Sequence, residues 1–159
     1  MDNKKFKLWN GICAAAAFVV SAVTYLLTIE PSASFWDCGE FIASSYKLEV
    51  GHPPGNPMFQ LIARIFTLFG DNMHAAILVN AMSALCSALT ILLLYLTIVW
   101  LAKRLVPASD GSFTTAQAVA IFGSGLVGSL VYCFSDTFWF SAVEGEVYAM
   151  SSLFTALVF

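Results

Sequence analysis

Charged residues are scarce in this chain of 159 residues. Asp, Glu, Lys and Arg make up 11% of it, whereas soluble domains carry about 25% charged residues. Hydrophobic residues account for 59% of the chain, and the mean hydropathy is +0.81. The shortage of charge excludes an ordinary soluble domain and indicates a membrane protein.

Patterns typical of metal-binding or nucleic-acid-binding proteins are also missing. The sequence has no CxxC spacing among its four cysteines and no basic cluster of the kind that binds nucleic acid. Cys13 and Cys86 fall inside apolar runs, where we expect them to pack. Cys38 and Cys133 fall near a common side of the membrane, so a disulfide between them is left open.

Long uncharged apolar runs are what the chain does contain. Three of them, at about 8–28, 75–101 and 116–134, reach the roughly 20 residues that a membrane-spanning helix needs. A fourth run, 145–159, is too short to span. We therefore expect 1–159 to be the N-terminal transmembrane segment of a larger protein. A cleaved signal peptide is the alternative for the first run, but its length exceeds the usual core of about 7–15 residues.

Basic residues predict the orientation of these runs. Five of the seven Lys and Arg residues flank the same ends of the first two runs: Lys4, Lys5, Lys7, Lys103 and Arg104. Because basic residues favour the cytoplasmic side, we expect a cytoplasmic N-terminus and an outer loop at 30–74. In a bacterial inner membrane this loop would be periplasmic. Eight of the ten acids fall in the outer segments.

The outer loop 30–74 is too long for a simple connector, and its sequence predicts two short helices. The first, 34–48, starts with a capping-box pattern formed by Ser34 and Asp37. One side is expected to be apolar (Phe35, Trp36, Phe41, Ile42 and Tyr46), and the other polar (Asp37, Glu40, Ser44 and Lys47).

The second predicted helix, 57–69, follows a rigid turn with the sequence GHPPGN. Asn56 is a good N-cap, Pro57 a good first residue, and Gly70 a terminator. Its apolar residues form one stripe: Met58, Leu61, Ile62, Ile65, Phe66 and Phe69. We expect both helices to lie in the plane of the membrane interface.

Two features are predicted for the third and fourth runs. Small residues four apart in GSGLVGS predict close helix packing in lipid. Ser141 and Glu144 repeat the capping-box pattern before the fourth run. If Asp37 and Glu144 only cap helices, each would stabilise its helix by about 0.3–1 kcal/mol and would need no other role. Glu146 and Asp136 are expected to be solvated or interfacial charges.

Two separated motifs carry a resemblance. FWDCGEFIASSYKLEVGHPPGNPMF followed by FWFSAVEGEVYAM resembles the N-terminal region of the bacterial DUF2723 membrane proteins, over essentially the whole chain. That family is related to the eukaryotic transmembrane O-mannosyltransferases and belongs with the GT-C glycosyltransferases. The resemblance implies an all-α, polytopic membrane helical bundle with in-plane helices on the first outer loop. It also implies a polyprenyl-phosphate sugar donor and a catalytic acid in that loop.

The resemblance further implies roles for individual residues. Asp37 is the expected base, Glu40 a second acid or the ligand of a divalent metal ion, and Glu144 an acid from the second outer loop. The relatives have adjacent acids where Asp37 and Glu40 are separated by two residues, which leaves open which of them acts. The expected substrate-binding residues are His52, Pro53, Pro54, Asn56, Trp36 and Tyr148.

The function implied is transfer of a sugar, with mannose expected, to protein hydroxyls on the non-cytoplasmic side. The expected partners are the polyprenyl-phosphate donor, a protein acceptor and the lipid bilayer, and no nucleic acid. The 159-residue piece by itself is expected to be inactive. Two alternatives stay open: a non-catalytic membrane scaffold, and a transporter subunit, which the few polar residues inside the runs disfavour.

Overall fold

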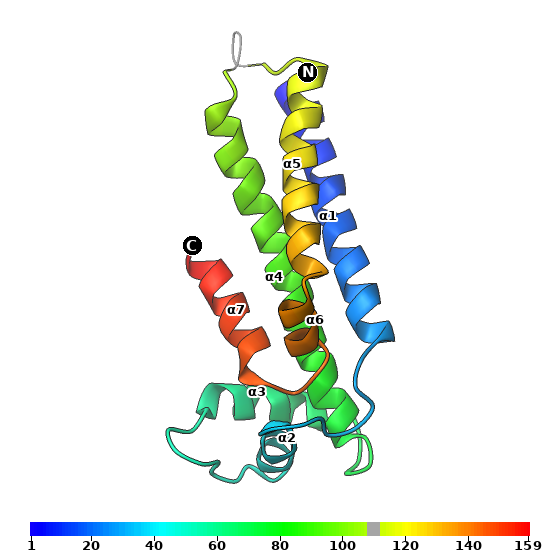
Figure 1. The fold of residues 1–159 in the computed structure, drawn as a ribbon, viewed down its shortest axis with the longest axis vertical. Helices are drawn as coiled ribbons and strands as arrows, with labels where there is room; N and C mark the ends of the chain where they lie inside the picture. Colours follow the sequence, from blue (N-terminus) through cyan, green and yellow to red (C-terminus); the bar gives the residue numbers. More distant parts are fainter. Residues whose placement is uncertain (108–111) are drawn as a thin grey trace.

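A computed structural model describes residues 1–107 and 112–159, and every element in this part is a helix (Figure 1). Three helices are long and apolar enough to cross a membrane: α1 (Asn3–Leu27), α4 (Ala75–Leu105) and α5 (Thr115–Cys133). Four are shorter: α2 (Cys38–Lys47), α3 (Pro57–Thr67), α6 (Asp136–Ala142) and α7 (Val147–Val158). The predicted all-α, polytopic membrane bundle is confirmed.

The three predicted spans are each found as one helix. α1 begins earlier than its apolar run because Asp2 caps it, accepting a hydrogen bond from the backbone N–H of Lys5 at 2.7 Å. The fourth run forms α7, which has 12 residues. The segment before it was expected to be a loop but contains α6, a helix of seven residues that is too short to give a clear sequence pattern.

The bundle is organised around α4, which contacts α1, α5 and α7. Small residues bring α5 close to it, as predicted. A Cβ added at Gly125 would lie 2.7 Å from Val99 Cγ2 and 2.8 Å from the Tyr95 ring. All four cysteines are free thiols, and Cys133 Sγ lies 3.2 Å from the Tyr25 hydroxyl that donates to it. The disulfide left open by the sequence is therefore not formed.

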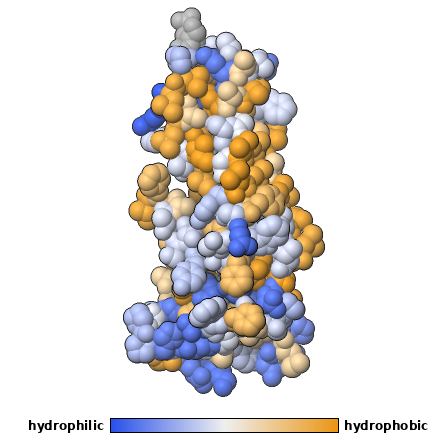
Figure 2. Space-filling view, viewed as in Figure 1, coloured by the Kyte–Doolittle hydropathy of each residue, from blue (hydrophilic) through white to orange (hydrophobic). Residues whose placement is uncertain are grey.

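The polar residues separate toward the two ends of the bundle. Lys103 Nζ lies 5.0 Å from the ring centroid of Phe6, so the basic ends of α1 and α4 adjoin as expected. The surface is largely hydrophobic along the bundle and hydrophilic at the opposite end, around α2 and α3 (Figure 2). This layering and the three long helices identify a multi-pass membrane protein.

Helices α2 and α3 lie across one end of the bundle (Figure 1). In α3 the buried residues are Phe59, Ala63 and Thr67. The predicted apolar stripe is divided: Ile62 and Phe66 pack against the buried cluster, whereas Leu61 and Ile65 are exposed, as suits a helix in the membrane interface. α3 ends at Thr67, earlier than predicted.

The predicted start of α2 is wrong. The helix begins at Cys38, with Asp37 in the N-cap position but without a side-chain capping bond. Trp36, with φ of 59°, interrupts the helical backbone, so it and Phe35 lie outside the helix and are exposed. Ser44, expected on the polar face, is buried and accepts a hydrogen bond from Gln60 Nε2 at 3.1 Å.

The second capping box is also wrong. Ser141 lies inside α6, and Glu146, not Ser141, precedes the first residue of α7. Glu144 instead accepts a hydrogen bond from Ser34 Oγ at 2.5 Å. The sequence pattern had assigned both the Ser34 hydroxyl and the Glu144 carboxyl group to helix caps. A tertiary contact therefore replaces two predicted local ones.

Candidate functional site

Hydrogen bonds join the first outer loop to the segment before α7. The backbone N–H of Glu30 donates to the carbonyl of Val143 at 3.0 Å. The Ser34 hydroxyl donates to Glu144 Oε2 at 2.5 Å. Ser34 and Glu144 are 110 residues apart in the chain. Their contact places Asp37, three residues after Ser34, near the start of α7.

Asn80 in α4 holds the first outer loop against the bundle. Its side chain is fully buried, and Nδ2 donates to the carbonyls of Glu30 at 2.7 Å and Ser32 at 3.1 Å. A polar residue within a membrane helix marks a functional or structural site by default. Here it satisfies two carbonyls of a loop that makes no regular secondary structure.

Gly145 lets the second loop lie directly against α4. A Cβ added there would lie 2.9 Å from Asn80 Oδ1 and 3.0 Å from Val79 Cγ1. Beside it, the fully buried Cys38 receives backbone hydrogen bonds from Ser34 and Gly145 that oppose the rise in the pKa of its thiol caused by burial. Any larger residue at 145 would push the neighbouring acids away from Asp37.

Two adjacent hollows open at this junction, and Asp37, Glu146 and Tyr148 line both. The first, of about 220 Å³, is also lined by His52, Pro54 and Asn56. The second, of about 260 Å³, is also lined by Trp36 and Glu144. Together we call them the acid groove. A larger hollow of about 430 Å³ between α4, α5 and α7 is lined without any carboxylate, histidine, lysine or arginine, so we place the site in the acid groove.

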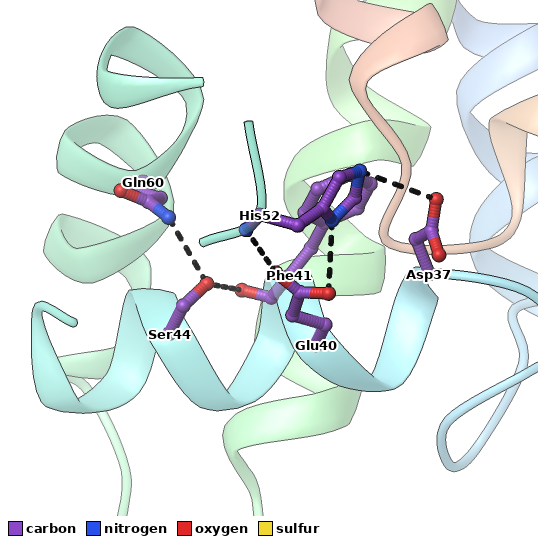
Figure 3. Close-up of polar contacts among 6 residues, drawn as sticks. All are labelled: Asp37, Glu40, Phe41, Ser44, His52 and Gln60. Carbon is purple, nitrogen blue, oxygen red and sulfur yellow. Dashed lines mark hydrogen bonds and ion pairs between the residues drawn. The ribbon is translucent and has the colours of Figure 1, made fainter. Parts of the chain in front are cut away.

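Glu40 holds the imidazole of His52 beside Asp37 (Figure 3). The backbone N–H of His52 lies 2.6 Å from Glu40 Oε1, and Nδ1 lies 2.9 Å from Oε2. The other ring nitrogen, Nε2, lies 3.9 Å from Asp37 Oδ2. The ring of Phe41 stacks on the imidazole at 6.2 Å between centroids.

These contacts shift the protonation of both partners. The hydrogen bonds from the backbone and ring of His52 lower the pKa of Glu40. The hydrogen bond to Glu40 and its charge raise the pKa of His52, and Asp37 adds to this effect. Glu40 therefore positions His52, and its carboxylate is already occupied by two donors.

Replacing Glu40 with glutamine is expected to lower the pKa of His52, because the negative charge that stabilises the imidazolium is removed. The chain has only two histidines, so the pH titration of the imidazole NMR signals follows His52 and His74 separately. Asp71, which lies 2.6 Å from His74 Nδ1, provides the control. Asp71→Asn should leave the His52 midpoint in place; an equal midpoint for His52 in Glu40→Gln and wild type would contradict the assignment.

Side chains of metal-ligand type meet in this cluster. Ligand atoms of Asp37, Glu40 and His52 lie within 4.8 Å of one another. The bond of Nδ1 to Glu40 leaves Nε2, 3.9 Å from Asp37 Oδ2, as the ring nitrogen on the side where an ion would lie. A carboxylate on the other ring nitrogen is the usual outer partner of a ligating histidine, so the position of Glu40 suits the orientation of His52.

Glu144 and Glu146 are buried, which corrects the expectation that Glu146 is a solvated charge. Their exposed fractions are 4% and 6%. Burial, the charge of Glu144 and the charge of Asp37 raise the pKa of Glu146 to about 7. Burial also raises the pKa of Glu144, opposed by the hydroxyl of Ser34.

The expected substrate-binding residues divide into two groups. Pro54, Asn56, Tyr148 and His52 line the first hollow, and Trp36, which is 88% exposed, lines the second. Pro53 lies in the exposed turn and lines neither hollow. The predicted N-cap bond of Asn56 is absent, and within the described part of the chain neither polar atom of its buried amide has a partner. That amide is free to bind a ligand.

Residues 37–159, a stretch that contains all of the acid groove except Trp36, match the family model described as "Protein O-mannosyl-transferase TMEM260 N-terminal domain". The chain belongs to this family. Among its relatives is "Protein O-mannosyl-transferase tmem260" of Dictyostelium discoideum, 26% identical over 149 residues, covering 92% of this chain and 16% of the relative. "Protein O-mannosyl-transferase TMEM260" of Mus musculus is 30% identical over 146 residues, covering 91% and 18%. The chain thus spans about a sixth of these relatives' length, and no solved structure matches it.

Two residues of this TMEM260 N-terminal domain site escaped the sequence reasoning. Asn80 is one of the few polar residues inside the apolar runs, and an amide at such a place is itself a signal. Glu146 stands in the sequence VEGEV, where nothing local tells a buried acid from a solvated one. Their importance appears only when the two outer loops are brought together.

Proposed function

We propose that this chain is the N-terminal part of an integral-membrane glycosyltransferase. It moves a sugar, mannose, from a polyprenyl-phosphate donor to protein hydroxyls on the non-cytoplasmic side. The observation that carries the proposal is the convergence of Asp37, His52, Glu144 and Glu146 on one groove from two loops. The names of the two relatives, both protein O-mannosyl-transferases, support it.

The groove residues suit this chemistry. A hydroxyl attacks a sugar more readily when a carboxylate accepts its proton, and Asp37 faces both hollows for this purpose. The departing phosphate needs hydrogen-bond donors, which His52 Nε2 and the amide of Asn56 provide. Glu40 acts as a positioning residue through its two bonds to His52.

The position of the groove suits a lipid-linked donor. It lies at the end of the bundle where the hydrophobic surface gives way to the hydrophilic cap around α2 and α3 (Figures 1 and 2). There a polyprenyl tail remains in lipid while its headgroup reaches water. The basic residues at the opposite end of α1 and α4 support a cytoplasmic N-terminus and an outward-facing groove.

A scaffold role in which Asp37 and Glu144 serve only as helix caps has less support. Asp37 makes no side-chain capping bond to α2. Glu144 bonds to Ser34 of the other loop and does not cap α7. The acids are placed around a hollow, an arrangement that a purely local role would not produce.

The proposal is tested by sugar transfer in the full-length protein reconstituted into liposomes. With radiolabelled polyprenyl-phosphate mannose and an acceptor protein, we expect label to enter the acceptor as a glycoside that alkali releases by β-elimination, as for a sugar on a serine or threonine hydroxyl. Mannose 1-phosphate, which lacks the lipid, should give no transfer. Absence of label with every polyprenyl-phosphate sugar offered would refute the proposed function.

A further inference from the structure

The acid groove contains no lysine or arginine among the residues that the structure describes. The outer loop has two such residues, and both have partners elsewhere. Lys47 Nζ lies 3.8 Å from Glu49. Arg64 donates to the carbonyl of Tyr46 at 2.6 Å and lies 5.3 Å from the Tyr46 ring centroid. An anionic leaving group in the groove would therefore face carboxylates.

Within the described part of the chain, two of the four nearby acids accept no hydrogen bond from a residue far along the chain; Glu146 accepts one from its neighbour Val147. Glu40 is occupied by His52, and Glu144 by the hydroxyl of Ser34. Asp37 and Glu146 remain, and both line both hollows. They differ in environment: the side chain of Asp37 is 57% exposed, whereas Glu146 is 6% exposed.

This difference favours the protonated form of Glu146. Burial and nearby negative charge both raise the pKa of a carboxyl group, so a buried acid beside other acids retains its proton to higher pH. Burial and the charges of Glu144 and Asp37 raise the pKa of Glu146 in this way. The groups that face Glu146 from the surrounding elements are Asp37, Cys38, His52, Glu144 and Tyr148.

We propose that Glu146 is a catalytic acid of the transfer, whose carboxyl group donates a proton to the departing phosphate while Asp37 accepts the proton of the attacking hydroxyl. This inference rests on the proposed function and adds a residue and a role to it. The two acids then have opposite tasks, assigned by their different burial.

The step balances without any further reactant. The bond from the anomeric carbon to the phosphate oxygen breaks, and a bond from the same carbon to the acceptor oxygen forms. The hydroxyl proton passes to Asp37, and the Glu146 proton passes to the phosphate. Transfer of the proton from Asp37 to Glu146 restores the starting state. The products are a glycoside and a phosphate monoester, whose second ionisation has a pKa of about 6.

The first test compares Glu146→Gln with Glu144→Gln, a matched variant two residues away, in the full-length protein. Glu146→Gln should reduce kcat about 10²–10⁴-fold and abolish the decline of kcat/KM with rising pH. Glu144→Gln keeps the bond from Ser34 through its amide oxygen, and it is compared by its pH profile, whatever its rate. Its decline should move to lower pH, since loss of the Glu144 charge lowers the pKa of Glu146.

If His52, and not Glu146, set the decline of kcat/KM with rising pH, the variants would behave differently. It would move in Glu40→Gln, which lowers the pKa of His52, and stay in place in Glu144→Gln. That outcome overturns the inference, as does a Glu146→Gln variant with wild-type rate and pH profile. If Glu146→Gln fails to fold, the shift in Glu144→Gln alone decides.

A second test does not depend on activity. Infrared difference spectra of the full-length protein should show the carbonyl band of a protonated carboxylic acid that titrates near pH 7. The band should be present in Glu144→Gln, at a lower midpoint, and absent in Glu146→Gln. A wild-type protein without the band overturns the inference even if it transfers sugar. A protein that shows the band but transfers no sugar refutes the proposed function, and with it the catalytic role of Glu146.

Discussion

Asp37→Asn is expected to lower sugar transfer by the full-length protein about 10²–10⁴-fold, the usual contribution of a positioned general base. Asparagine keeps the size of the side chain but cannot accept the proton of the acceptor hydroxyl. It also removes one of the charges that raise the pKa of Glu146. The loss should therefore appear in kcat, with little change in KM for the donor, in initial-rate measurements with the lipid-linked sugar.

Asp136→Asn is the control for that result. Asp136 is an exposed acid in the first turn of α6 and lines neither hollow of the acid groove. Its replacement should leave transfer near the wild-type rate. If Asp37→Asn transfers sugar as fast as Asp136→Asn, Asp37 is not the base and the proton must pass directly to another group.

Gly145→Ala is expected to destabilise the protein by about 1–3 kcal/mol, the cost of overpacking a close-packed site. The added Cβ would lie 2.9 Å from Asn80 Oδ1. Asn80 cannot easily move away, because its Nδ2 bonds to the carbonyls of Glu30 and Ser32. Thermal unfolding in detergent measures the loss. Transfer should fall as well, since displacement of Glu146 by about 1 Å is enough to cost 10²-fold.

Gly123→Ala in α5 separates this effect from a general response to the loss of a glycine. A Cβ at Gly123 meets no atom within 4 Å. Its replacement should be neutral or stabilising by up to about 1 kcal/mol, the helix-propensity difference between glycine and alanine. Equal melting temperatures for Gly145→Ala and Gly123→Ala would show that the loop does not lie tightly against α4.

Local sequence patterns predicted the helices well because each helix depends mainly on residues that are close together in the chain. The apolar runs of α1, α4 and α5 need no partner to be recognised, since their length alone matches the bilayer. The basic residues near α1 and at the end of α4 likewise predicted that these ends adjoin, as the contact of Lys103 with Phe6 confirms. The short α6 was missed because seven residues hold too little periodicity.

Local patterns failed where a side chain had a better partner far along the chain. Ser34 and Glu144 each looked like half of a capping box, yet they bond to each other across 110 residues. Glu40 looked like a catalytic acid or metal ligand, and its partner His52 is supplied by the proline turn. For Ser34 and Glu144 the spacing assigned the wrong contact, and for Glu40 it could not show the partner that the fold supplies.

By itself, the sequence determined the membrane class, the three spanning helices and the location of the candidate residues in the outer segments, because composition and run length fix how a chain partitions into lipid. The tertiary structure alone decided which acids are buried. Glu146 and Asp37 are chemically similar carboxyl groups, and only the packing of the second loop against α4 through Gly145 buries one and leaves the other in water. Protonation depends on that surrounding solvent and charge, which no stretch of sequence encodes on its own.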